Sequence, residues 1–171
     1  MRIELVSRQQ HESLVDLLCE LHSFYNNGAS VRREMVRSHL VENLLGADSP
    51  LILVVAVRKD ETVAGFAAIA LTYSLVDPSP DLRRHCQLKE LYVRASERSQ
   101  SVGKAIMSWV AQYAIKNNCC RIDWPVKAAN SRGISFYERL GATQVVERLS
   151  FRLSEPGLTE LASQSTYWVG K

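Results

Sequence analysis

The chain has 171 residues, 46% apolar and 23% charged, which is ordinary for one globular domain with a full core. Its net charge of +3 is too small to indicate a nucleic-acid-binding protein, although it suits a small polyanionic ligand. The amino terminus lacks a secretory signal pattern, and no apolar run approaches the roughly 18 residues of a membrane-spanning helix. We therefore expect one domain, residues 1–171, that is soluble and cytoplasmic, with no membrane or nucleic-acid partner.

Four cysteines are present, and none of them shows the CxxC spacing of a metal or redox site. Two are adjacent, Cys119 and Cys120, and adjacent residues make an awkward disulfide or metal-binding unit. We expect reduced structural thiols and no metal.

The first third of the chain predicts a strand followed by two helices. Residues 3–6 are apolar enough for a short strand, and residues 14–25 place apolar side chains three and four apart, as in a helix with one buried face. A second helix is predicted from about residue 31 to residue 45. Its basic side chains read as a solvated surface more readily than as a binding patch: Arg32, Arg33 and Arg37.

The middle of the chain predicts a hairpin of two buried strands and then a third strand. Residues 51–57 and 62–73 are continuous apolar runs rich in β-branched residues, separated by a charged turn. Gly65 indicates close packing or a bulge in the second run. A loop with two prolines covers residues 74–84, and residues 87–93 form the next strand.

The last part of the chain alternates helices and strands. Helical spacing covers residues 102–117, and a strand is expected over residues 119–126, where Pro125 indicates an edge or a break. A helix over residues 134–140 ends at Gly141, a strand follows over residues 143–153, and one helical turn lies near residues 158–162. The order predicts an α/β fold with a mixed sheet, in which residues 87–126 make a strand–helix–strand crossover with two parallel strands.

Residues 88–105 join a strand end, a polar loop and a helix within one short stretch. A helix entered from such a loop presents unpaired backbone N–H groups and the positive end of its dipole, which together favour an anion such as phosphate. An ordinary strand–loop–helix connection explains this stretch alone equally well.

Two motifs carry a resemblance to a known family. Residues 90–107 (ELYVRASERSQSVGKAIM) look like the acyl-CoA pyrophosphate motif of the GNAT superfamily of N-acetyltransferases, and residues 130–142 (NSRGISFYERLGA) resemble its second signature. The resemblance covers roughly residues 2–153 and is most similar in appearance to the diamine and polyamine acetyltransferases. It implies a central sheet of about six to seven strands with helices on both faces. A splayed parallel strand pair would then form the cleft for acetyl-CoA, the cosubstrate.

The resemblance also implies which residues contact acetyl-CoA. It places Asn130 and the strand backbone against the pantetheine arm, the strand residues being Leu91, Tyr92 and Val93. The phosphate loop would comprise Arg98, Ser99, Gln100, Ser101, Val102, Gly103 and Lys104. Its motif begins at Arg98 or, in an alternative register, at Gln100. Ser101 replaces a glycine, so any positive φ there costs stability, and Lys104 either contacts phosphate or is simply solvated.

The same resemblance suggests catalytic roles. Tyr137 matches the tyrosine that protonates the departing CoA thiolate, although an amphipathic core tyrosine is the plain alternative. The backbone N–H near Val93 would stabilise the oxyanion. Lys89 stands where many family members have a glutamate, and Glu90 follows one place later, as a base or as a structural or acceptor-orienting carboxylate. Other candidates for proton removal are Tyr73, His85 and His22.

The expected reaction is acetyl transfer to a primary amine of a small molecule by direct transfer in a ternary complex. Lys89 would repel a polyamine, so an amino acid, a small amine or an aminoglycoside-like acceptor is comparably plausible. The alternatives are a non-catalytic acyl-CoA-binding module and an enzyme acting on protein or tRNA amines. The resemblance further implies a homodimer formed through the last strands, with the apolar residues 166–171 taking part.

Overall fold

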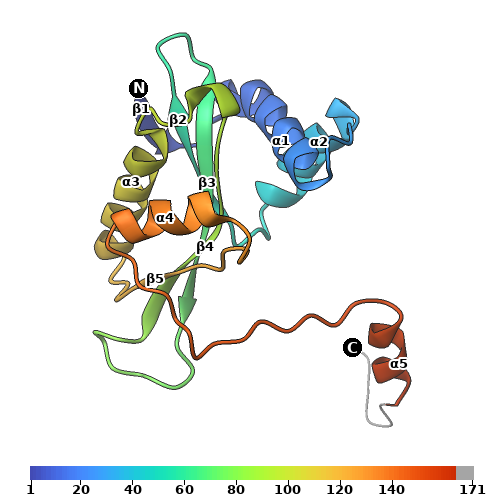
Figure 1. Cartoon of the computed structure of the whole chain (residues 1–171), viewed down its shortest axis with the longest axis vertical. Coiled ribbons are helices and arrows are strands. Elements are labelled where there is room, and N and C mark those ends of the chain that lie inside the picture. The colour runs from blue at the N-terminus through green and yellow to red at the C-terminus, as the bar shows by residue number, and fades with distance from the viewer. Residues whose placement is uncertain (165–171) are drawn as a thin grey trace. The chain divides into compact units, whose positions relative to one another are not determined.

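The computed structural model describes residues 1–164, which are coloured in Figure 1. They fall into two compact units divided between Ala129 and Asn130. The first unit contains the whole sheet, and the second contains two short helices. In the part of the chain that the structure describes, no helix is both long and apolar enough to cross a membrane.

Five strands form the sheet, and their order in space is their order in the chain. They are β1 (Arg2–Leu5), β2 (Ile52–Val57), β3 (Val63–Tyr73), β4 (Arg84–Val93) and β5 (Ile122–Asp123). The first three pairings are antiparallel, and β4 pairs with β5 in parallel. The strand–helix–strand crossover predicted over residues 87–126 is therefore confirmed.

Helices cover both faces of this sheet, as Figure 1 shows for α1 (His11–Tyr25) and α3 (Val102–Lys116). On the α1 side, α1 is followed by α2 (Arg33–Ser38) and a π-helical turn, His39–Leu44. The main core joins α1 to the sheet through buried apolar side chains, including Leu14, Leu17, Leu40, Val55, Phe66 and Tyr92. The predicted apolar stripe of the first helix is thus the face that packs on the sheet.

The β2–β3 hairpin is buried along nearly its whole length, which explains the continuous apolar runs in its sequence. Gly65 lies in β3 beside a register shift, and a Cβ there would lie 2.9 Å from Tyr92 O and 3.2 Å from Ile106 Cδ1. Both expectations for this glycine, close packing and a bulge, are confirmed. The close approach lets α3 pack directly against the middle of the sheet.

The predicted number of strands was wrong, because the sheet formed by residues 1–164 has five strands and not six to seven. The strand expected over residues 119–126 shortens to β5, beyond which Pro125 has no N–H to donate. Residues 143–153 form no strand. A strand requires a partner for its backbone groups, and residues 130–164 of the second unit contain no strand that could provide one.

The second unit contains α4 (Ser131–Arg139) and α5 (Gly157–Ser163), close to the helices predicted there. The Oδ1 atom of Asn130 caps α4 by accepting a hydrogen bond from the N–H of Gly133 at 2.9 Å. Gly141 follows the helix with φ of +86°, as its predicted C-terminal position requires. Residues 166–171, expected to take part in a dimer, lie outside the described residues.

Candidate functional site

The carboxyl-terminal half of β4 has an open edge in the first unit. Pairing with β5 is limited to Cys86 and Gln87, whereas β4 continues to Val93. The N–H of Arg94 donates to Ala64 O in β3 at 2.9 Å, and successive residues of a strand point their backbone groups to opposite edges. Leu91 and Val93 therefore direct their N–H and C=O groups toward the open edge.

A bulge in β4 marks the start of this open half. Ala68 of β3 pairs with Glu90 and Ile69 pairs with Leu88, so Lys89 between them has no partner. Such an extra residue bends a strand and re-aims the side chains that follow it. Lys89 is exposed, whereas Glu90 is partly buried on the side of the sheet that α1 covers.

Glu20 of α1 joins the end of β4 to the loop that follows it. Its Oε1 accepts hydrogen bonds from the Tyr92 hydroxyl at 3.1 Å and from the Ala95 N–H at 2.8 Å. The guanidinium of Arg94 lies 3.6 Å from the other carboxylate oxygen. One carboxylate thus fixes the direction in which the chain leaves the sheet, a role that the sequence did not indicate.

Arg98, expected at the start of the phosphate loop, turns back toward the sheet. Its guanidinium lies 5.5 Å from the ring centroid of Phe24 and 5.3 Å from that of Tyr92, within cation–π range. Its Nε donates to Val93 O at 3.0 Å. The side chain therefore anchors the loop, and backbone N–H groups are left as the donors that this stretch offers to an anion.

The loop reaches α3 through two serines in the left-handed region, Ser99 with φ of +65° and Ser101 with φ of +62°. The positive φ considered for Ser101 is therefore present, at the residue directly before α3. The first backbone bond of the helix runs from the Ala105 N–H to Ser101 O, at 3.0 Å. The preceding N–H groups of Val102, Gly103 and Lys104 have no acceptor within the helix, so this end of α3 has the donors that the predicted anion site requires.

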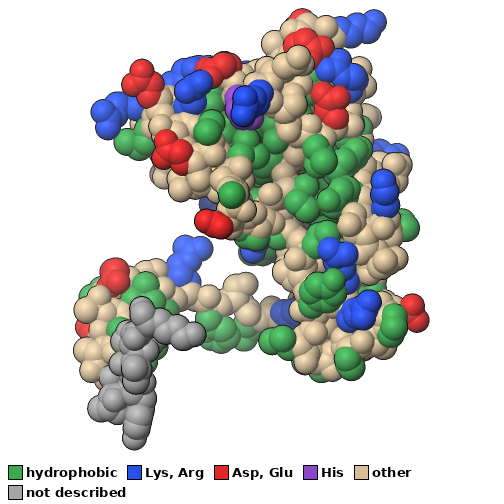
Figure 2. Space-filling model, turned by 180° about the vertical axis from the view of Figure 1, so that it is seen from behind, with side chains coloured by type: hydrophobic (Ala, Val, Ile, Leu, Met, Phe, Trp, Pro, Cys, Tyr) green, Lys and Arg blue, Asp and Glu red, His purple; other side chains and the backbone are tan. Residues whose placement is uncertain are grey.

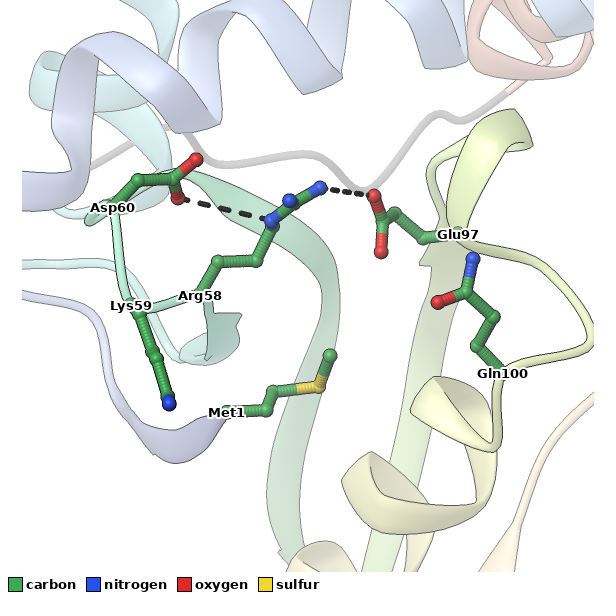
Figure 3. A pocket seen from close by; sticks show the side chains of 6 residues that line it. All are labelled: Met1, Arg58, Lys59, Asp60, Glu97 and Gln100. Carbon is green, nitrogen blue, oxygen red and sulfur yellow. Dashed lines mark hydrogen bonds and ion pairs between the residues drawn. The ribbon is translucent and has the colours of Figure 1, made fainter.

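A shallow pocket of about 360 Å³ lies under this loop (Figure 3). Glu97 is only 7% exposed, and one of its oxygens accepts a hydrogen bond from Arg58, whose guanidinium also faces Asp60 (Figure 3). Gln100 lines the same pocket and donates to Ser96 O at 3.1 Å. The pairing of Arg58 with Glu97 connects the loop after β4 to the turn between β2 and β3.

Glu90 lies close to Tyr25 at the end of α1. The Tyr25 hydroxyl donates to Glu90 Oε1 at 3.2 Å, and the Lys127 ammonium lies 4.6 Å from the centre of the Tyr25 ring. Burial raises the pKa of Glu90, while Tyr25, the Leu91 N–H and the charge of Lys127 oppose that rise. Sequence reasoning missed Tyr25 and Lys127, because they reach Glu90 only through the folding of distant segments.

The other candidates for proton removal are engaged elsewhere. In His85, Nε2 lies 3.0 Å from Leu82 O and Nδ1 lies 3.2 Å from an Arg121 nitrogen, so the ring bridges two partners. His22 Nδ1 lies 3.3 Å from Ala29 O. Tyr73 is 64% exposed, and the guanidinium of Arg84 lies 5.4 Å from the centre of its ring. Among these candidates, Glu90 therefore has the surroundings most suitable for removing a proton.

Residues 13–142 match the acetyltransferase (GNAT) family. The chain belongs to the GNAT family. The match includes both motifs identified in the sequence and runs across the boundary between the two units.

Named relatives of this GNAT chain are acetyltransferases. It is 31% identical over 84 residues to a thialysine N-epsilon-acetyltransferase of Mus musculus, covering 47% of this chain and 49% of the relative. It is 30% identical over 99 residues to an L-ornithine N5-acetyltransferase of Arabidopsis thaliana, covering 58% and 42%. The matched part thus spans about half or less of these relatives.

Solved structures share the fold of this GNAT chain. An integron cassette protein from the mobile metagenome of V. cholerae superposes with a TM-score of 0.84 at 28% identity, covering 94% of this chain and 96% of the other. An aminoglycoside N-acetyltransferase solved with CoA superposes with a TM-score of 0.65 at 18% identity, covering 90% and 99%. At that identity the second likeness shows the fold alone.

The second motif of the GNAT chain lies in the second unit. Asn130 was expected to hold the pantetheine arm, and its Oδ1 is occupied by the cap of α4. Its Nδ2 group keeps the donor chemistry that such a contact uses. Tyr137, the expected acid, lies on α4 with its ring centroid 5.2 Å from that of Phe136.

Two of the three arginines on the basic face predicted for the second helix, Arg33 and Arg37, are paired with carboxylates in the GNAT chain. Arg33 bonds to Glu12 and Asp16, both at 2.7 Å, and Arg37 bonds to Glu12 at 2.6 Å. Figure 2 shows the described Lys and Arg side chains interspersed with Asp and Glu over the face in view. Within residues 1–164 no group of three His, Cys, Asp or Glu side chains is placed to hold a metal ion.

Proposed function

We propose that this GNAT chain is an acetyl-CoA-dependent N-acetyltransferase that acts on a primary amine of a small molecule by direct transfer in a ternary complex. The main support is the end of β4, where an open strand edge leads into a loop with unpaired N–H groups beside a partly buried carboxylate. Membership of the GNAT family and the named relatives support the same reaction class.

The proposed place of acetyl-CoA follows the chain from β4 to α3. Its pyrophosphate would accept hydrogen bonds from the N–H groups of the first turn of α3, in the loop from Arg98 to Lys104. Its pantetheine arm would lie along the open edge of β4 at Leu91, in the manner of an added strand, which leaves the Val93 N–H available to the thioester carbonyl. The donor set fits the ligand, since a polyanion requires N–H donors and an extended amide chain requires a strand edge.

The proposed chemistry assigns one task to each group. The N–H of Val93 stabilises the oxyanion formed when the amine attacks the thioester carbonyl. Tyr137 donates a proton to the departing thiolate, whose ordinary pKa is about 8.5. Glu90 holds the acceptor amine and assists its deprotonation, because a carboxylate at this position attracts an ammonium group.

The proposed acceptor is a compact alkyl amine such as an amino acid with a side-chain amine. The relatives are named for thialysine and ornithine, both of which carry such an amine. We also propose a cytoplasmic homodimer, to which residues 143–153 contribute, since their apolar side chains are exposed, among them Val146, Leu149 and Phe151.

The direct test measures CoA thiol release from acetyl-CoA with a panel of amines that contains ornithine, lysine, 1,4-diaminobutane, spermidine and an aminoglycoside. We expect thiol release that depends on the amine and is fastest with the compact acceptors. Binding of acetyl-CoA without release for any amine would show a non-catalytic acyl-CoA-binding module instead.

Replacement of Tyr137 by Phe tests the proposed acid. We expect kcat to fall about 10²-fold, within the range of general acid catalysis, while the Kd for CoA changes less than about twofold. Thiol-release assays measure kcat, and calorimetric titration measures the Kd for CoA. Equal losses in kcat and in CoA affinity, or no loss in either, would contradict the role.

A further inference from the structure

We propose that Lys127 occupies the subsite for the acceptor's ammonium group, which Tyr25 and Glu90 form, and that an incoming amine must displace it. Lys127 then acts as an internal competitor that sets the apparent affinity for the acceptor. The inference rests on the proposed function and adds to it the residues that bind the cationic end of the amine.

The geometry of three side chains carries this inference. The Lys127 Nζ lies 4.6 Å from the centre of the Tyr25 ring, and the Tyr25 hydroxyl donates to Glu90 at 3.2 Å. Lys127 and Glu90 are close enough for their opposite charges to interact. The ring face and the carboxylate together make the environment that binds an alkyl ammonium ion.

The occupant has the same chemistry as the proposed substrate. A lysine side chain ends in a primary ammonium on a flexible alkyl stem, as do the amines proposed above. Lys127 lies after β5 in a short stretch without regular structure, and its side chain is exposed, so it can move away. Tyr25 is also accessible, with 42% of its surface exposed.

The size of the competition follows from the contacts that Lys127 would lose. One exposed cation–π contact and a longer-range attraction between Lys127 and the Glu90 carboxylate correspond together to roughly a threefold to tenfold change in an equilibrium constant. Because the amine replaces both contacts when it binds, the cost appears in the KM for the amine and leaves kcat unchanged.

A different role for Lys127 would have the opposite effect on the KM for the acceptor. Lys127 would bind the carboxylate of an amino acid acceptor if its ammonium faced that group. The observed position on the ring beside Glu90 favours competition, because the ammonium occupies the place that the acceptor's own ammonium requires.

Kinetics of Lys127→Met test the proposal, since methionine keeps the length of the side chain and removes its charge. We expect the KM for ornithine and for 1,4-diaminobutane to fall threefold to tenfold with kcat unchanged. Lys116→Met, at an exposed position at the end of α3, is the matched control and should change neither constant. An unchanged KM, or a KM that rises for ornithine alone, would overturn the proposal, and the second outcome would assign Lys127 to carboxylate binding.

A binding measurement separates failure of this inference from failure of the proposed function. Reductive ¹³C-methylation labels the lysines, and the Lys127 signal, identified by its loss in Lys127→Met, should be shifted upfield by the Tyr25 ring. Saturation with 1,4-diaminobutane should move it to the position of exposed lysines. If no amine supports thiol release but the signal moves, the function is wrong and the subsite stands. A signal that does not respond to the amine overturns the subsite.

Discussion

The two ends of β4 differ in how completely their backbone groups are paired with neighbouring strands. At the amino-terminal end, Cys86 pairs with both β3 and β5, and burial raises the pKa of its thiol to about 11. His85 beside it is buried, with both ring nitrogens close to partners. Past the bulge at Lys89, the strand has an open edge, and burial raises the pKa of Glu90.

This difference separates the part of β4 that stabilises the fold from the part that can bind a ligand. Groups that are fully paired and buried contribute to folding and have no capacity left for a ligand. Open backbone groups and a partly desolvated carboxylate are costly to keep, and they persist where the surrounding structure compensates for them. Changes at the two ends should therefore separate loss of activity from loss of stability.

The largest effect is expected at the open end, from Glu90→Gln. We expect kcat/KM for the amine to fall about 10²-fold, because the charge that attracts and helps deprotonate the acceptor is removed. In the wild type, the rate should rise with pH as Glu90 ionises, above the ordinary range of a glutamate, and this limb should be absent in the variant. A pH series of kcat/KM measures both changes, with the exposed Glu34→Gln as control.

Stability gives a second reading on Glu90→Gln. The pKa of Glu90 is higher in the folded chain than in the unfolded chain, so its ionisation lowers stability as the pH rises through the folded pKa. The variant should therefore unfold at pH 7 at a denaturant concentration no lower than the wild type. A large loss of stability, or retention of the low-pH limb, would contradict the assignment.

A smaller effect, on stability and not on activity, is expected at the amino-terminal end of β4 from His85→Ala. Loss of the buried ring removes one contact each from Leu82 O and Arg121, which keep their contacts with Cys120 Sγ and Asp123, and it leaves a cavity. Together these changes should cost about 2 kcal/mol of unfolding free energy, or roughly 4–8 °C in Tm. Calorimetry measures Tm, and titration of active enzyme gives kcat per folded molecule, which should be unchanged. A selective loss of kcat at full stability would return His85 to the list of catalytic candidates.

Sequence reasoning predicted the parts of this fold that depend on local patterns. The apolar stripe of α1, the β2–β3 hairpin and the start of α3 at Val102 follow from spacing and turn chemistry. The bulge at Lys89 and the shortness of β5 depend on pairing between strands, which local patterns do not encode. The strand expected over residues 143–153 failed for the same reason, since β-propensity without a partner does not make a strand.

The candidate site was also predicted only where it depends on local sequence. The loop from Arg98 to Lys104 was identified from its motif, including the strain at Ser101. The contacts of Glu20, Tyr25 and Lys127 were not identified, because each joins segments far apart in sequence. Glu20 and Ala95 are 75 positions apart, and Tyr25 and Glu90 are 65 apart. Such neighbours emerge only from the packing of α1 on the sheet.

The smallest effect is expected where the open end meets α3, from Ser101→Gly compared with Ser101→Ala. The positive φ of +62° strains any residue with a Cβ by about 1 kcal/mol, and glycine removes this strain. Glycine also gains about 0.4–1 kcal/mol of freedom in the unfolded chain, so the net change from wild type should be small. Alanine keeps the Cβ and lacks the hydroxyl, and should therefore be no more stable than wild type.

Urea unfolding measures the stabilities, and calorimetric titration gives the Kd for CoA, which should fall less than about threefold in the glycine variant. An alanine variant clearly more stable than the glycine variant would contradict the strain assigned to position 101.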